Sequence, residues 1–159
     1  MPGEGRKIRK QITRCYIAAL FVCFLDQLSK YYAAKLILQG DSLPIIKNIF
    51  HFTLVHNTGA AFGLFKDRPE LFVLISVFSI IFILYFLAYR SGKLNRVERT
   101  ALCFILGGAS GNLIDRVRLG YVTDFIDFRV WPVFNIADSF ISIGAVMLVL
   151  AIVVTRRGH

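Results

Sequence analysis

Residues 71–89, LFVLISVFSIIFILYFLAY, form a continuous run without a charged side chain. As an α-helix this run would be about 28 Å long, close to the thickness of the hydrocarbon core of a bilayer. The chain is 56% apolar and contains 15 Phe, a composition typical of membrane proteins. The predicted spans are residues 12–32, 71–89, 99–115 and 137–155. Because four spans use most of the 159 residues, we expect one all-α, membrane-embedded domain covering residues 1–159.

The distribution of Lys and Arg predicts the orientation of these spans. An even number of spans places both termini and the 90–99 loop on one side. That side holds 11 of the 19 basic residues and only Glu4 and Glu98 as acids, a net charge of +9. By the positive-inside rule it is the cytoplasmic side. The basic residues therefore indicate topology and contact with anionic lipid, and we expect no nucleic-acid binding.

The two loops on the opposite side carry most of the sequence motifs. Residues 33–70 include PIIKNIFHFTLVHNTGAAFGLF, in which the 44–56 stretch is rich in β-branched and aromatic residues. This composition predicts one or two short strands, a small β-like cradle lying on the membrane surface. The second loop, 116–136, contains Tyr121, Trp131 and several Phe, which suit the bilayer interface.

Small and sulfur-containing residues of the spans have structural interpretations. Gly107 and Gly111 predict close packing of the third span against a neighbouring helix. Cys15, Cys23 and Cys103 show no CxxC spacing, so we interpret them as packing residues and expect neither a disulfide nor a zinc site. The basic and then apolar N-terminus resembles a signal sequence without a convincing cleavage site, which favours an uncleaved first helix.

Carboxylates gather near the outward ends of the spans. Each has a local structural role available to it: Asn135 and Asp138 have the spacing of a helix N-cap and its third residue, and Asp26 and Lys30 that of a helix-surface ion pair. The acids of the second outward loop, Asp124 and Asp127, could be solvated. These local roles do not account for the clustering of so many acids at one boundary.

A pair of carboxylates at such a boundary would have a distinct chemistry. Two acids that face each other in a poorly hydrated site share one proton, so that one member can activate water and the other can protonate a leaving amine. This chemistry is metal-free amide hydrolysis at the lipid surface. The residues alone leave open which two acids form the pair, and Asp115 and Asp124 are equal candidates to face Asp138.

Five motifs along the chain resemble those of the lipoprotein signal peptidases (signal peptidase II). They are DQLSK at 26–30, HNTGAAFG at 56–63, GGASGNLIDR at 107–116, VTDF at 122–125 and FNIAD at 134–138, in the family's order. The resemblance implies a bacterial inner-membrane aspartic endopeptidase without metal or cofactor. Such an enzyme removes the signal peptide of prolipoproteins by cutting before the diacylglyceryl-modified cysteine, at a site facing the periplasm. Its partners would be lipidated prolipoproteins and membrane lipid, and no oligomer is required.

The resemblance also implies roles for individual positions. Asp124 and Asp138 match the catalytic dyad, and Asp138, at a helix N-terminus, is expected to be the ionised member. Arg116 could bind substrate carbonyls or pair with Asp115. The supporting and substrate-binding positions implied by the resemblance are Asp26, Lys30, Asn57, Gly108, Asn112, Asp115, Arg116, Asn135 and Ala137.

Two other classes of protein remain as alternatives. A small proton-coupled transporter can also have four spans, and Asp26 would then be the coupling residue. The clustering of acids at one face, away from the midplane, argues against it. A purely structural membrane subunit would leave the clustered Asp and Asn residues unexplained.

Overall fold

A computed structural model of the chain describes residues 2–59, 69–90 and 92–157. Side chains are described for 5–59, 70–90 and 92–154, so residues 60–63 of the HNTGAAFG motif lie outside the described part. The elements in chain order are α1 (Pro2–Leu36), β1 (Ser42–Ile46), β2 (Phe50–Asn57), α2 (Pro69–Arg90), α3 (Arg96–Leu119), β3 (Val122–Asp127) and α4 (Ile136–Arg157).

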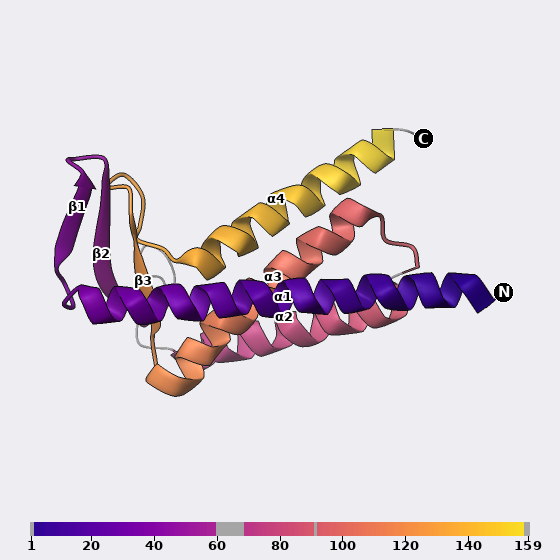
Figure 1. The fold of residues 1–159 in the computed structure, drawn as a ribbon, viewed down its shortest axis with the longest axis horizontal. Coiled ribbons are helices and arrows are strands. Elements are labelled where there is room, and N and C mark those ends of the chain that lie inside the picture. The colour runs from indigo at the N-terminus through magenta and orange to yellow at the C-terminus, as the bar shows by residue number, and fades with distance from the viewer. Residues whose placement is uncertain (1, 60–68, 91, 158–159) are drawn as a thin grey trace.

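All four predicted spans are helical, and the helices form one bundle with a small sheet at one end (Figure 1). Among the described residues, three helices are long and apolar enough to cross a membrane: Gly5–Leu36, Glu70–Arg90 and Ile136–Val154. The expected span at 99–115 forms α3, which is not apolar enough to be one of these three helices. The reason lies in its position, because α3 packs against α1, α2 and α4 and therefore presents little surface to lipid.

Glycines allow α3 to approach its neighbours closely. A Cβ at Gly107 would lie 2.5 Å from the carbonyl oxygen of Ala19 in α1, and one at Gly108 would lie 2.5 Å from that of Ala137 in α4. A Cβ at Gly111 would collide with the carboxylate of Asp26. The predicted close packing of this helix through glycine is thus confirmed, and it involves two neighbouring helices.

The sheet is three-stranded and antiparallel, in the order β1-β2-β3. The strands predicted around 44–56 are β1 and β2, whereas β3, in the second outward loop, was not predicted. Its pairing with β2 aligns Val55 with Asp124 and Asn57 with Val122. The sheet therefore fixes residues 122–127, from one loop, against residues 50–57 of the other.

The interpretation of two cysteines is wrong. Cys15 of α1 and Cys103 of α3 are joined in a disulfide, although they are separated by 88 positions in the chain. Both lie in a buried apolar cluster between the helices, at the end of the bundle far from the sheet. No CxxC spacing marks this pair, because the sulfurs are brought together only by packing of α1 on α3.

Candidate active site

Asp124 lies in the middle of β3 and is almost completely buried, with 1% of its surface exposed. One carboxylate oxygen accepts a hydrogen bond from Asn57 Nδ2 at 2.9 Å, and the other accepts one from Asn135 Nδ2 at 2.7 Å. The strand is directed back toward the bundle by Gly120, which ends α3 in the left-handed conformation at φ 79°. Its burial excludes the alternative that Asp124 is a solvated loop acid.

Asp138 lies in the first turn of α4 and is half-buried. Its backbone N–H donates to Asn135 Oδ1 at 2.8 Å, and its side chain accepts from the backbone N–H of Asn135 at 3.3 Å. This reciprocal pair is a capping box, as the N-x-x-D spacing predicts. The second oxygen of Asp138 accepts from Asn112 Nδ2 at 2.8 Å.

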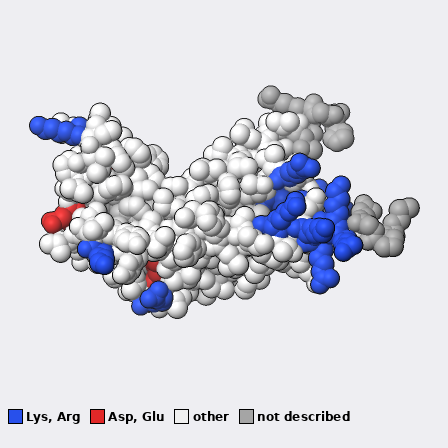
Figure 2. Space-filling view, in the orientation of Figure 1, with Lys and Arg blue, Asp and Glu red and all other residues white. Residues whose placement is uncertain are grey.

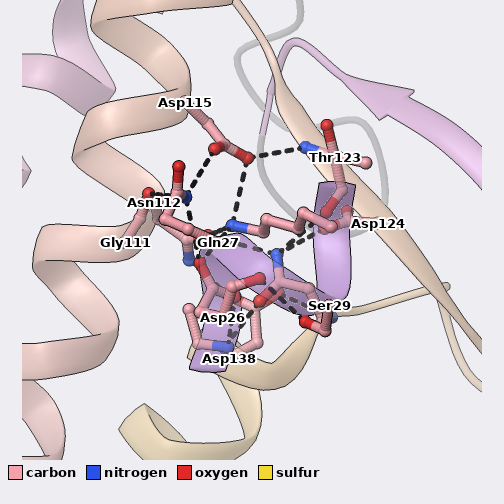
Figure 3. Close-up of polar contacts among 12 residues, drawn as sticks. Asp26, Gln27, Ser29, Gly111, Asn112, Asp115, Thr123, Asp124 and Asp138 are labelled. Atoms are coloured by element: carbon pink, nitrogen blue, oxygen red, sulfur yellow. Dashed lines mark hydrogen bonds and ion pairs between the residues drawn. The ribbon is translucent and has the colours of Figure 1, made fainter. Parts of the chain in front are cut away.

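Asn135 connects the two acids. Its amide nitrogen donates to Asp124 while its amide oxygen caps the helix that bears Asp138. Asn135 is fully buried, at 0% exposure, and its amide nitrogen also lies 3.1 Å from Asn112 Oδ1. Asn112 and Asn135 thus hold two carboxylates, one from β3 and one from α4. Figure 3 shows Asn112, Asp124 and Asp138 in one group of polar side chains.

The environment of Asp124 favours its protonated form. Burial and the negative charge of Asp138 raise the pKa of Asp124 to about 7, although hydrogen bonds from Asn57 and Asn135 act in the opposite direction. Near neutral pH the two carboxyl groups can therefore hold a proton between them. Such a pair can supply a general base and a general acid to the same reaction.

Asp115 has different partners and does not face Asp138. Its oxygens accept hydrogen bonds from Gln27 Nε2 at 2.8 Å and from the backbone N–H of Thr123 at 3.0 Å, and one oxygen lies 3.0 Å from Lys30 Nζ. Figure 3 shows Asp115 at the top of this group of polar side chains and Asp138 at the bottom, with the contact of Asp115 to Gln27 between them. Asp115 therefore holds α1 and the start of β3 together, which distinguishes it from Asp124.

Asp26 and Lys30 form the predicted i, i+4 ion pair, at 2.8 Å, but the pair is buried and does not lie on a helix surface. The other oxygen of Asp26 accepts from the backbone N–H of Ala137 at 2.9 Å. Lys30 Nζ also donates to Asn112 Oδ1 at 2.8 Å. Lys30 and Asp138 therefore both bond to the side-chain amide of Asn112, which connects them.

Gly108 and Ala137 contribute through their small size. Ala137 is completely buried, and its carbonyl oxygen faces the Cα of Gly108 where α3 and α4 are in contact. Larger side chains at these two positions would separate the helices that carry Asn112 and Asp138.

Two other charged residues differ from expectation. Among the described residues Arg116 forms no ion pair with Asp115, and its guanidinium lies over the ring of Phe72, 5.4 Å from the centroid. Asp127 is not solvated: it is 5% exposed and accepts from Thr53 Oγ1 at 2.7 Å and from Arg129 Nη1 at 3.1 Å. Asp127 therefore fixes the outer end of the sheet and lies away from the paired acids.

A cavity of about 470 Å³ opens beside Asp138. Apart from Asp138 itself and two serines, its lining is apolar, from residues of the β3–α4 connection and the first turns of α4. The lining residues are Phe128, Trp131, Phe134, Asp138, Ser139, Ser142 and Ile143. The cavity can accept an apolar group next to a carboxylate.

Sequence reasoning gave no role to Gln27. Its amide donates to Asp115 and to the carbonyl oxygen of Gly111 at 3.1 Å, so that it ties α1 to α3. Its position inside DQLSK, between Asp26 and Lys30, was the available signal. The contact of Thr123 with Asp115 uses the backbone, and no side-chain pattern could have indicated it.

Comparison with known proteins agrees with this arrangement. A family model described as signal peptidase (SPase) II matches residues 18–154. A protein named lipoprotein signal peptidase from Halothermothrix orenii is 48% identical over 135 residues, covering 85% of this chain and 92% of its own. One of the same name from Caldanaerobacter subterraneus subsp. tengcongensis is 50% identical, covering 83% and 90%.

The fold is also shared with solved structures. One, described as a bacterial membrane enzyme obtained by the in meso method at 2.3 Å resolution, superposes with a TM-score of 0.82 at 34% identity. The match covers 89% of this chain and 88% of that one. A second, at 1.9 Å resolution, has a TM-score of 0.79 at the same identity. Since the family model covers most of the chain and the relatives match along nearly their whole length, the chain belongs to the signal peptidase II family.

Proposed function

We propose that this protein is a membrane aspartic endopeptidase that removes the signal peptide from prolipoproteins, cleaving before the diacylglyceryl-modified cysteine. The observation that carries this proposal is the pair Asp124 and Asp138, joined through Asn135, with the pKa of Asp124 raised to about 7 by burial and by the charge of Asp138. Membership of the signal peptidase II family and the relatives' names supply the substrate class.

In the proposed reaction, Asp138 is the base. Its position in the first turn of α4, with Asn112 and the backbone of Asn135 as donors, favours the carboxylate. It takes a proton from a water molecule, whose oxygen attacks the scissile carbonyl carbon. Asp124, protonated, hydrogen-bonds to the carbonyl oxygen as negative charge develops there.

Collapse of the tetrahedral intermediate breaks the C–N bond. The proton taken up by Asp138 passes to the leaving nitrogen, which becomes the free amine of the lipidated cysteine. The signal peptide departs with the new carboxylate. Asn57, Asn112 and Asn135 hold the two acids in position by hydrogen bonds from neutral amides, which add no further charge to the dyad.

The same proposal includes the membrane setting. The chain would cross the bacterial inner membrane four times, with both termini in the cytoplasm. The third crossing would be α3, which the other helices shield from lipid. The sheet and the paired acids would then face the periplasmic side. The apolar cavity beside Asp138, of about 470 Å³, would receive an apolar part of the substrate, and a single chain would suffice.

The geometry does not favour a transporter that couples through Asp26. Asp26 is 0% exposed, and its oxygens are engaged by Lys30 and by the N–H of Ala137. A coupling residue must exchange protons with water during each cycle. Asp26 instead connects α1 with the start of α4, which positions Asp138.

The test is cleavage of a purified, diacylglyceryl-modified prolipoprotein by the purified protein. We expect Asp124→Asn and Asp138→Asn each to reduce turnover by at least about 10³-fold. Asp138→Asn removes the base, and Asp124→Asn removes the acid that is hydrogen-bonded to the carbonyl oxygen as negative charge develops there. Asp127→Asn is the matched control, since Asp127 is another buried acid of β3 with partners outside the pair. Near-normal turnover by either dyad variant would contradict the proposal, as would cleavage at a bond other than that before the lipidated cysteine.

A further inference from the structure

A basic cleft lies at the end of the bundle opposite the sheet. Two adjoining cavities of about 330 and 400 Å³ lie between the first turns of α1 and the start of α3, and both are lined by Gln11, Arg96 and Arg99. Arg14 and Thr100 line the first cavity, and Lys7 and Asn95 line the second. Figure 2 shows Lys and Arg gathered at this end of the molecule, around the beginning of α1.

The charge of the cleft is strongly positive. Four cationic side chains line it: Lys7, Arg14, Arg96 and Arg99. Within the described part of the chain, no acid lies within ion-pair distance of Lys7, Arg14 or Arg96. Glu98, the nearest acid in sequence to Arg96 and Arg99, is engaged by the backbone N–H of Asn95, where it completes the capping box of α3.

Arg99 and a disulfide hold part of the cleft wall in place. Arg99 is only 9% exposed, and its Nη2 donates to the carbonyl oxygen of Leu94 at 2.9 Å. The Cys15–Cys103 disulfide also lines the first cavity and ties α1 to α3 below it. Arginines on a rigid frame suit a phosphate group, because the guanidinium offers several N–H donors in a fixed geometry.

We propose that this cleft binds the phosphate group of an anionic membrane phospholipid. The source is a lipid because the cleft-lining residues Arg14 and Ala18 of α1 are followed, within one turn of the helix, by exposed apolar side chains. Ile17, Leu20 and Phe21 are 61%, 71% and 59% exposed. An acyl chain can follow this surface while the headgroup phosphate lies among the arginines. Basic pockets between membrane helices are known to hold such headgroups. The site is distinct from the paired acids, which lie at the sheet end of the bundle.

The test is lipid binding measured by native mass spectrometry on the purified full-length protein, released from detergent. Phosphatidylglycerol and phosphatidylcholine with the same acyl chains are titrated separately. We expect phosphatidylglycerol to bind roughly tenfold or more tightly, and Arg14→Gln/Arg96→Gln to remove that preference. Both residues are exposed, so the variant leaves the helix packing intact, and an unchanged melting temperature verifies this.

The matched control is Arg6→Gln/Lys10→Gln, which removes two charges from exposed positions of α1 that do not line the cleft. We expect it to change phosphatidylglycerol affinity by less than about threefold, as a non-specific charge effect. An equal loss in both double variants would overturn the proposal, as would equal binding of the two lipids. Inorganic phosphate is the third arm: variant-sensitive binding of phosphate without retention of lipid would show a free-anion site and contradict the lipid assignment.

Discussion

Asn135 is the residue on which the candidate site depends most. One side chain both caps α4 and bonds to Asp124, so the position of the helix start and the position of the strand acid are fixed by the same amide. The donor is a neutral amide, so Asn135 itself neither gains nor loses charge when the acids exchange a proton. Helix capping and acid–base chemistry are therefore compatible uses of Asn135 and Asp138.

Asp124 should make the stability of the folded protein depend on pH. Its pKa is raised from 3.8 to about 7 by burial and by Asp138, so between these values the folded state retains a proton that the unfolded state has lost. The free energy of unfolding therefore falls as pH rises from about 4 to about 7, by about 4 kcal/mol, and changes little from this group beyond that range. Melting temperatures in detergent, recorded for the wild type and Asp124→Asn across this range, measure the effect.

The comparison with Asp124→Asn cancels the titrating residues that do not interact with Asp124, so the remaining difference reports the Asp124–Asp138 pair. We expect the wild type to lose stability relative to the variant as pH rises. A constant difference between the two melting temperatures from pH 4 to 7 would refute the raised pKa.

The local chemistry of the site was predictable where it depends on short sequence spacing. The capping of α4 by Asn135 and the Asp26–Lys30 pair follow from spacings of three and four residues. The partner of Asp138 was not predictable in this way, because Asp115 and Asp124 differ only in tertiary contacts. Asp115 is engaged by Lys30, Gln27 and Thr123, and none of these contacts is local.

At the scale of elements, the distance between α3 and α4 sets the distance between Asn112 and Asp138. Gly108→Ala places a methyl group where the carbonyl oxygen of Ala137 lies 2.5 Å away, so the helices must separate. We expect a loss of about 1–3 kcal/mol of stability and a large loss of proteolytic activity. Melting temperature and turnover of the lipidated prolipoprotein measure the two effects.

Gly5→Ala is the control for this substitution. It adds the same methyl group to a glycine in a helix, at an exposed site with nothing within 4 Å. Since alanine is the better helix former, its stability should be unchanged or slightly higher. Equal behaviour of the two variants would mean that the contact between α3 and α4 tolerates the methyl group.

Helices were more predictable than strands in this chain. The four largely apolar stretches predicted α1, α2, α3 and α4, because a stretch of this kind about 20 residues long is typical of a membrane helix and rare in strands or loops. The β3 strand, VTDFID, is short and was hidden by the aromatic character of its loop, although its β-branched residues were a usable signal. The disulfide required knowledge of how α1 packs on α3.

The two ends of the molecule differ in the side chains that they carry. Basic side chains gather where α1 begins, and the sheet with the buried acids lies at the other end (Figure 2). The helices between them present apolar side chains outward, such as Phe78, Phe82 and Val146, which are 72%, 62% and 59% exposed. This distribution agrees with the membrane setting proposed above, in which the paired acids lie toward one surface of the bilayer.

The four-span topology makes a prediction for the two sides of the membrane. Lys47, between β1 and β2, and Lys93, between α2 and α3, are both exposed and lie on opposite sides if α2 crosses the bilayer. In a Cys23→Ala background, which leaves Cys15 and Cys103 in their disulfide, we expect Lys47→Cys to react with a membrane-impermeant maleimide added to intact spheroplasts. Lys93→Cys should react only after permeabilisation.

The background protein alone reports any labelling of native cysteines. If both variants reacted before permeabilisation, these loops would share one side and α2 could not be a simple crossing. If Lys93→Cys alone reacted, the orientation drawn from the distribution of Lys and Arg would be reversed.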